Sequence, residues 1–142
     1  MFLGEVRHSL DEKGRVTLPS TSRSHFAGGC VVTRGRDGCL WVFPNSEWER
    51  VAESFRSLST AQREVRNARR FFLGSASEET PDGQGRIRIP SPLRTYANLS
   101  KEVVISGEAD RLEIWDAATW DGMQDELSAS IETLSETTGL PI

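Results

Sequence analysis

The chain has 142 residues, of which 37% are hydrophobic and 27% are charged. This length fits one domain, or two small units that share a core, and the low apolar content predicts a soluble protein with a modest core. No apolar run approaches the roughly 20 residues that a membrane helix needs. The first ten residues, MFLGEVRHSL, lack the basic and apolar regions of a signal peptide, so we expect a cytoplasmic protein.

The net charge of −4 is unevenly distributed along the chain. Residues 1–75 carry twelve Lys and Arg against eight Asp and Glu, whereas residues 76–142 carry five against thirteen. An acidic total normally argues against nucleic-acid binding, but such binding requires only a local positive surface. The acidic half can also meet the basic half of a neighbouring subunit.

Residues of the types that catalyse reactions or bind metals are scattered in this sequence. Cys30 and Cys39 form no CxxC motif, and we expect both to be buried apolar residues without a disulfide. His8 and His25 have no partner pattern, and no Gly-rich nucleotide-binding loop is present. We therefore expect no enzymatic activity, no catalytic residue, no metal site and no cofactor.

The first predicted strand, in FLGEVRHSL, leads into a tight turn. In DEKG, Asp11 suits the first position of a type I turn and Gly14 suits the fourth, where positive φ forms a G1 bulge. The next strand alternates, so Val16 and Leu18 face one side and Arg15 faces the other.

Helices and a hairpin follow this turn. Ser20 is expected to cap a short helix. CVVTRG then turns through the dipeptide DG into CLWVF, which predicts a β-hairpin. Two capping boxes, SEWE from Ser46 and STAQ from Ser59, predict helices that end near Leu58 and Gly74.

The second of these helices carries a stripe of arginines at helical spacing, Arg63, Arg66, Arg69 and Arg70. Such a stripe can touch the DNA backbone. It can equally be a solvated face or a contact with an acidic neighbour, and we favour these two interpretations.

The same plan repeats seventy-one residues further along the chain. DGQGRIRIP from Asp82 repeats DEKGRVTLP from Asp11, and alternation places Ile87 inward and Arg86 and Arg88 outward. After one extra residue the spacing becomes seventy-two, and VVISG turns into LEIW as VVTRG turns into LWVF.

The second copy also ends in helices. Ser91, followed by Pro92, is expected to cap a short helix, and Asp116 begins the last one. That helix weakens into the polar tail LSETTGLPI, which we expect to be frayed. Trp48 and Trp120 occupy equivalent positions and are expected to hold each helix to its hairpin.

Each copy has about forty residues, which is too few for a stable core of its own. Two copies in one chain can pair about a pseudo-twofold axis and close a small barrel. The repeat therefore predicts a mainly β fold with short helices.

Four segments of the chain resemble the MraZ family. They are MFLGEVRHSLDEKGRVTLPSTSR, VVTRGRDGCLWVFPNSEWERV, RRFFLGSASEETPDGQGRIRIPSPLR and VVISGEADRLEIWDAATW. The resemblance runs from Met1 to about Trp120, and DxxxR occurring twice with these flanks makes it specific. It implies two AbrB-like swapped-hairpin repeats that form a pseudo-twofold split β-barrel, plus a C-terminal helix. The implied parts are a first DNA-binding repeat (1–50), a connecting helical segment (51–73), a second DNA-binding repeat (74–120), and a C-terminal helix and tail (121–142).

The resemblance also implies a function and partners. Proteins of this family are sequence-specific, DNA-binding transcriptional regulators that bind direct repeats upstream of their own operon, the division and cell-wall gene cluster. The implied partners are double-stranded DNA and further copies of the chain, in a ring-shaped homo-oligomer. The implied location is the cytoplasm, in association with the nucleoid and not with a membrane.

The DxxxR motif of the family falls on two pairs of residues. The expected DNA-binding residues are Asp11, Lys13, Arg15, Asp82 and Arg86. Arginine can donate two hydrogen bonds to guanine or clamp a phosphate, and lysine adds a phosphate contact. Each Asp can orient its Arg, although such a pair can also be a surface ion pair worth under about 1 kcal/mol. The second loop has Gly and Gln where the first has Glu and Lys, so we expect its positive potential to be weaker.

Two other functions remain open from the sequence. The chain could be a ring-forming scaffold whose acidic half binds a protein partner. It could also be an AbrB-like antitoxin, a protein-binding module that needs a toxin-binding tail. For that role ELSASIETLSETTGLPI is short and only weakly amphipathic.

Overall fold

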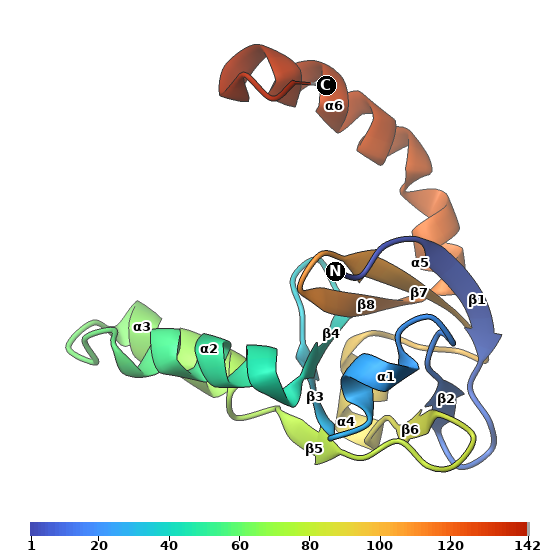
Figure 1. Ribbon diagram of the computed structural model, residues 1–142. Helices are drawn as coiled ribbons and strands as arrows, with labels where there is room; N and C mark the ends of the chain where they lie inside the picture. The colour runs from blue at the N-terminus through green and yellow to red at the C-terminus, as the bar shows by residue number, and fades with distance from the viewer. Residues whose placement is uncertain (142) are drawn as a thin grey trace.

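The computed structural model describes residues 1–141, apart from the side chain of Ser135, so the end of the predicted segment 121–142 lies outside it. The strands are β1 (Glu5–Ser9), β2 (Arg15–Thr17), β3 (Cys30–Arg34), β4 (Leu40–Pro44), β5 (Ser77–Glu79), β6 (Arg86–Arg88), β7 (Glu102–Glu108) and β8 (Arg111–Asp116). The helices are α1 (Arg23–Phe26), α2 (Asn45–Arg56), α3 (Arg63–Phe72), α4 (Ser91–Tyr96), α5 (Ala117–Gly122) and α6 (Gln124–Thr138). The expected mainly β fold with short helices and a C-terminal helix is confirmed (Figure 1).

The two copies exchange strands within one antiparallel sheet. Its strand order is β1-β7-β8-β4-β3-β5. The first strand of the first copy, β1, therefore pairs with β7 of the second copy, and β5 of the second copy pairs with β3 of the first. Neither copy forms its part of the sheet alone, so the two copies are one folding unit.

Strands β2 and β6 form a separate two-stranded ribbon. Val16 lies opposite Ile87, which is its own counterpart seventy-one residues later. In the large sheet, Trp41 of β4 lies opposite Glu113 of β8, its counterpart seventy-two residues later. Both pairings place equivalent residues face to face, as an approximate twofold axis requires. The closure of the two sheets into a split barrel stays a prediction.

The copies also share one hydrophobic core. Val16, Leu18, Ile87 and Ile89 are completely buried, which confirms the inward face predicted from the alternation. They belong to one cluster with buried residues of β3, β4, β7 and β8. Fully burying one such side chain contributes roughly 1.5–3 kcal/mol, so each copy stabilises the other.

The two cysteines are buried and unbridged, as predicted. Burial raises the pKa of the Cys30 thiol to about 12 and also raises that of the Cys39 thiol. Both thiols are therefore neutral at physiological pH and pack as small apolar side chains.

The helices begin at residues other than those that the sequence predicts. The caps expected at Ser20, Ser46, Ser59 and Ser91 are wrong, because the cap positions are Ser22, Pro44, Gln62 and Pro90, none with a side-chain capping bond. For α2 the cause is tertiary. The Asn45 side chain donates a hydrogen bond to the Gly28 carbonyl at 2.9 Å, and its backbone N–H donates one to Gly29 at 3.3 Å. These bonds fix the start of the helix one residue before Ser46.

The C-terminal tail differs from the expectation of a frayed segment. Helix α6 continues to Thr138 and ends at Gly139, which adopts the left-handed conformation typical of a helix terminus. Figure 1 shows α6 arching away from the sheets, while α2 and α3 form a hairpin that projects from another side of the molecule.

The tryptophans pack as expected. The Trp48 ring lies 5.7 Å from Phe43, and the Trp120 ring lies 6.0 Å from Trp115, measured between ring centroids. Trp120 is buried and Trp48 is half-buried. Each ring attaches a helix to the strand before it, so the first turns of α2 and α5 are anchored in the same way.

We expect Leu18→Ala to lower the free energy of unfolding by about 2–5 kcal/mol, because it leaves a cavity in the shared core. Denaturant unfolding at fixed protein concentration measures this change. Leu3, which is 75% exposed, supplies the matched control, and Leu3→Ala should change the free energy by less than about 0.5 kcal/mol. Equal effects of the two substitutions would contradict the shared core.

Candidate nucleic-acid interface

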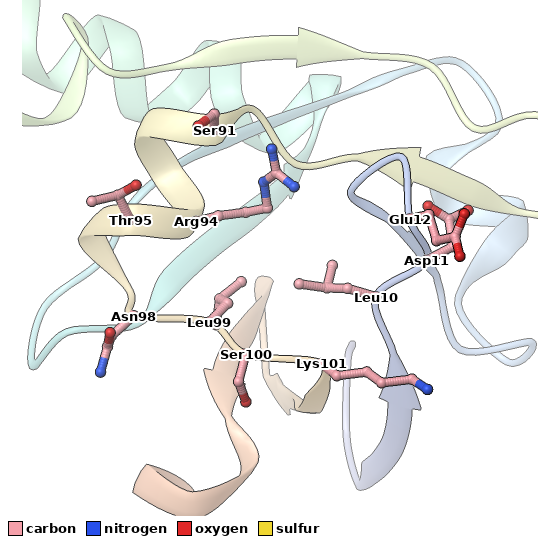
Figure 2. A pocket seen from close by; sticks show the side chains of 10 residues that line it. All are labelled: Leu10, Asp11, Glu12, Ser91, Arg94, Thr95, Asn98, Leu99, Ser100 and Lys101. Carbon is pink, nitrogen blue, oxygen red and sulfur yellow. The ribbon is translucent and has the colours of Figure 1, made fainter.

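A cleft of about 820 Å³ lies beside the first loop (Figure 2). Its walls carry two basic side chains, Arg94 and Lys101, and two acidic ones, Asp11 and Glu12. This balance of charge suits neither an anion nor a cation. The features that can bind a ligand lie instead on the loop itself and on the ribbon that it joins.

Both loops are type I turns with a bulge, as predicted. The Gly14 N–H donates to the Asp11 carbonyl at 3.0 Å, and the Gly85 N–H donates to the Asp82 carbonyl at 2.9 Å. The glycines have φ of +73° and +75°, in the left-handed region that side chains other than glycine disfavour. The two DxxG sequences therefore produce two copies of one loop geometry.

The Asp11 carboxylate organises the first loop. Its Oδ1 accepts hydrogen bonds from the backbone N–H groups of Lys13 and Arg15, each at 2.9 Å. Its Oδ2 accepts the Nε–H of the Arg15 side chain at 2.7 Å. These bonds, above all the one from the Arg15 backbone, lower the pKa of Asp11. The carboxylate thus fixes both the turn and the direction of the arginine.

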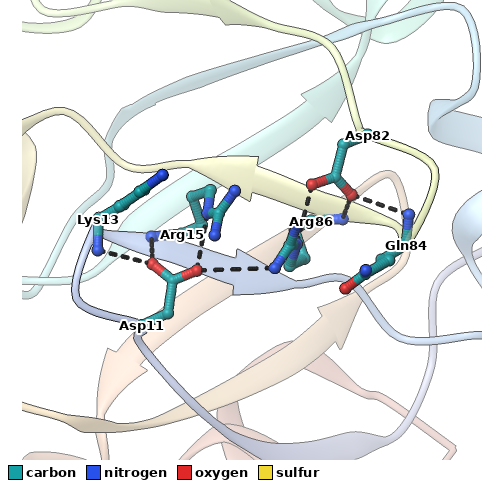
Figure 3. Close-up of polar contacts among 6 residues, drawn as sticks. All are labelled: Asp11, Lys13, Arg15, Asp82, Gln84 and Arg86. Carbon is teal, nitrogen blue, oxygen red and sulfur yellow. Dashed lines mark hydrogen bonds and ion pairs between the residues drawn. The ribbon is translucent and has the colours of Figure 1, made fainter.

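The Asp82 carboxylate does the same in the second loop (Figure 3). It accepts the backbone N–H groups of Gln84 at 2.9 Å and Arg86 at 3.0 Å, and the Nε–H of Arg86 at 2.8 Å. The backbone hydrogen bond from Arg86 is the largest cause of a pKa lowered to about 2. The carboxylate is therefore ionised throughout the physiological pH range.

The two loops approach each other across the ribbon. The Arg86 Nη1 atom lies 4.0 Å from Oδ2 of Asp11, so the second arginine reaches the first carboxylate. Figure 3 shows both arginines between the two aspartates. Each arginine uses Nε for its own aspartate, an arrangement that leaves the outer edge of the guanidinium group for a ligand.

The outward face of the ribbon is basic. Arg15 lies opposite Arg88, and Thr17 lies opposite Arg86, while Val16 points into the core. The strand alternation predicts that Arg88 points outward, but the DxxxR motif does not include Arg88 among the expected binding residues. The signal that could have identified it is its position two residues after Arg86 on the same face of one strand.

The positive charge is concentrated at one end of the ribbon. Because the strands are antiparallel, Arg88 lies at the end of the first loop, together with Lys13 and Arg15. At the end of the second loop, Arg86 stands near the uncharged Thr17 and Gln84. The loop sequences already predict a weaker positive potential at the second loop. The strand pairing increases this difference, because it places Arg88 at the end of the first loop.

Each loop packs against an arginine of the other copy. A Cβ on Gly14 would come within 2.5 Å of the Arg94 guanidinium, and one on Gly85 would come within 2.5 Å of Nε of Arg23. Arg23 and Arg94 are sequence equivalents, and Arg23 also donates to the Leu18 carbonyl at 3.2 Å. The positive φ favours glycine at each loop, and the absence of a side chain also lets the arginine of the other copy pack closely against the turn.

One protein-family model matches each of the two copies separately. The family model described as "MraZ protein, putative antitoxin-like" matches residues 1–71 and again residues 72–140. The chain belongs to the MraZ family. Proteins named "Transcriptional regulator MraZ" are 45% identical in Frankia alni, 46% in Natranaerobius thermophilus and 46% in Thermobifida fusca. Each alignment covers 96% of this chain and 95% of the relative.

The residues of the two DxxxR sequences lie close together on the ribbon, whereas the arginine stripe lies elsewhere. The four arginines lie on α3 in the projecting hairpin, where Arg63 and Arg70 are exposed and Arg66 and Arg69 are half-buried. Figure 1 shows this hairpin far from β2 and β6. The stripe and the ribbon are therefore separate basic surfaces.

Two further observations concern the described part of this MraZ chain. Within residues 1–141, no group of three or more His, Cys, Asp and Glu is arranged to hold a metal ion. Among the same residues, no helix is both long enough and apolar enough to cross a membrane.

We expect the Asp82 carboxyl group to titrate with a midpoint near pH 2, below its ordinary value of 3.8. A lowered pKa in the folded state stabilises the fold above about pH 4, and this contribution is lost as the pH falls toward 2. Carboxyl-carbon NMR shifts during an acid titration measure the midpoint. A midpoint near 3.8 for Asp82 would contradict the loop geometry.

Proposed function

We propose that this protein is a sequence-specific transcriptional regulator that binds double-stranded DNA through the β2–β6 ribbon. Its targets are direct repeats in the promoter upstream of its own operon, the division and cell-wall gene cluster. The name shared by its relatives supports regulation of transcription, and the basic ribbon supports the mode of DNA contact.

The observation that carries this proposal is the display of three arginines on one two-stranded ribbon. The major groove of B-DNA is about 12 Å wide and admits a two-stranded β-ribbon. Arg15, Arg86 and Arg88 all point outward from the ribbon, and two of them are already oriented by carboxylates. Side chains held in place lose little conformational entropy on binding, which favours base recognition over loose attraction.

The roles of the individual residues follow from their chemistry. Arg15 and Arg86 donate two hydrogen bonds to O6 and N7 of guanine, while Asp11 and Asp82 hold them in position. Lys13, on an exposed and flexible side chain, contacts a phosphate. Arg88 adds a contact at the end of the first loop, which therefore contributes more to binding than the second.

The regulator acts as a homo-oligomer, in a ring whose subunits follow one another head to tail. Neighbours in such a ring present the same ribbon in the same direction, which matches direct repeats better than palindromes. The regulator acts in the cytoplasm, where it associates with the nucleoid. One ribbon makes a small contact, so further subunits supply the additional affinity.

Two alternatives predict different behaviour in salt. Binding that neutralises Z phosphates falls with salt with a log–log slope of about −0.9Z. A ring-forming scaffold that binds a protein partner through apolar contacts lacks this slope. The antitoxin alternative differs in its partner and not in its response to salt. It requires a toxin that covers α6, where the side chains of Leu127, Ile131 and Leu134 are exposed.

We expect Arg15→Ala to weaken binding to the specific site by about 1–3 kcal/mol, because it removes a base contact. Titration by gel shift, with specific and unrelated DNA at one salt concentration, measures the loss. Arg15→Lys should recover phosphate attraction but not the specificity that depends on two parallel hydrogen bonds.

The matched control for this experiment is Arg50→Ala, which removes the same charge from the exposed surface of α2. It should leave specific binding unchanged. If folded Arg15→Ala protein bound as tightly as the Arg50→Ala protein, the ribbon would not be the DNA-binding surface.

We expect affinity to rise steeply with the number of DNA repeats. When subunits are linked, the second contact is intramolecular and can add a factor of about 10²–10⁴ in affinity. Fragments that carry one, two or three copies of the site test this, and a spacer lengthened by half a helical turn, about 5 bp, should remove the gain. Equal affinity for all fragments would show that assembly plays no part in recognition.

A further inference from the structure

The α2–α3 hairpin has the properties of a surface that is covered by a partner. Neither helix contains a buried residue, although together they span Asn45–Arg56 and Arg63–Phe72. Leu58, in the turn between them, is 48% exposed. The aromatic side chains of the hairpin are at most half-buried, so the hairpin gains less from the hydrophobic effect than a helix of the core does, and an additional contact would stabilise it.

The charge on this hairpin restricts the partner. Helix α3 carries four arginines and one acidic residue, Glu64. Arg63 and Arg70 are exposed and lie seven residues apart, on one face of the helix. The surface that covers this face is therefore expected to be acidic, with apolar groups for Leu58 and the arginine stems.

A groove with these properties lies at the base of α6. It has a volume of about 520 Å³, and its apolar wall is made by Trp115, Trp120, Met123 and Leu127. Asp37, Glu113 and Glu126 also line it. Tryptophan, methionine and arginine are the residue types enriched in the centres of protein interfaces, and three acidic groups beside indole rings suit arginine in particular.

The carboxylate of Glu113 is held in place within this groove. Its Oε2 atom accepts the indole N–H of Trp41 at 3.0 Å, and its Oε1 atom accepts that of Trp115 at 3.1 Å. A carboxylate has about four acceptor positions, so each oxygen keeps capacity for a further hydrogen bond. Two fixed, half-buried oxygens of this kind match the two-pronged donor geometry of a guanidinium group.

We propose that this groove, lined by residues from β8, α5 and α6, receives the α3 face of a second copy of the chain. An α3 arginine pairs with Glu113 and Glu126, and the apolar tip of the hairpin covers the tryptophans. The inference rests on the homo-oligomer proposed above and assigns its contact surfaces.

A chain cannot make this contact with itself. Figure 1 shows the hairpin and the base of α6 on different sides of the molecule. The contact is therefore heterologous, with one surface donated and another received by every subunit. Such contacts propagate from copy to copy until a ring closes.

The experiment uses two full-length variants, each with one surface disabled. The groove variant is Glu126→Arg with Leu127→Arg, and the hairpin variant is Arg63→Glu with Arg70→Glu; all four side chains are exposed or largely so. Sedimentation velocity without DNA is expected to give an oligomer for the native chain and a monomer for each variant. Mixed in equal amounts, the variants should form a dimer and nothing larger, because only one intact interface remains.

A matched control carries a similar charge change elsewhere on α6. Asp125→Arg with Glu136→Arg alters exposed residues on the helix face opposite Leu127, and it should assemble like the native chain. Loss of assembly in this control, native assembly in either disabled variant, or a mixture that stays monomeric would each overturn the proposal. So would a native chain that is itself monomeric.

A second measurement requires no variant to fold. Amide hydrogen exchange in the native chain is expected to slow in α3 and around Trp120 when the concentration is raised through the assembly range. Unchanged exchange in either segment would contradict the contact. Because neither measurement includes DNA, failure of the DNA-binding proposal would leave both outcomes unaffected, and a monomeric hairpin variant should still bind a single DNA site.

Discussion

The exchange of strands between the two copies is the constraint on which the rest of the structure depends. Strand β1 of the first copy pairs with β7 of the second, and β5 of the second copy pairs with β3 of the first. Each copy therefore supplies an edge strand to the hairpin of the other. The inward side chains of β2 and β6 then fill a single core. A unit of about forty residues cannot bury enough apolar surface alone. The exchange of strands joins two such units around one core, so that each buries apolar surface of the other.

This constraint also creates the candidate DNA-binding surface. Since Val16 faces Ile87 in the core, the residues on either side of this pair must point outward, and most of them are arginines. The loops meet the ribbon from opposite ends, and each is supported by an arginine of the other copy through Arg23 or Arg94. The packing of each loop therefore depends on both copies.

The departures from symmetry are as informative as the symmetry. Trp41 and Glu113 are counterparts, yet one is an indole and the other a carboxylate that accepts its N–H. The basic residues gather at the first loop and on α3, and the acidic ones gather on the second copy and α6. A perfectly symmetric chain would carry the same charge on both copies, whereas this one is basic in its first half and acidic in its second.

Local features could be predicted from the amino-acid sequence: the two bulged turns of DxxG, the alternation that buries Leu18 and Ile89, the hairpins, and the MraZ membership. These follow from short-range chemistry, since a turn or an alternating strand needs only its own residues. The start of α2 and the position of Arg88 beside Arg15 come instead from the tertiary structure. Each depends on which distant segments meet in the fold. No local pattern specifies that β2 pairs with β6, or that the Asn45 side chain donates a hydrogen bond to the Gly28 carbonyl.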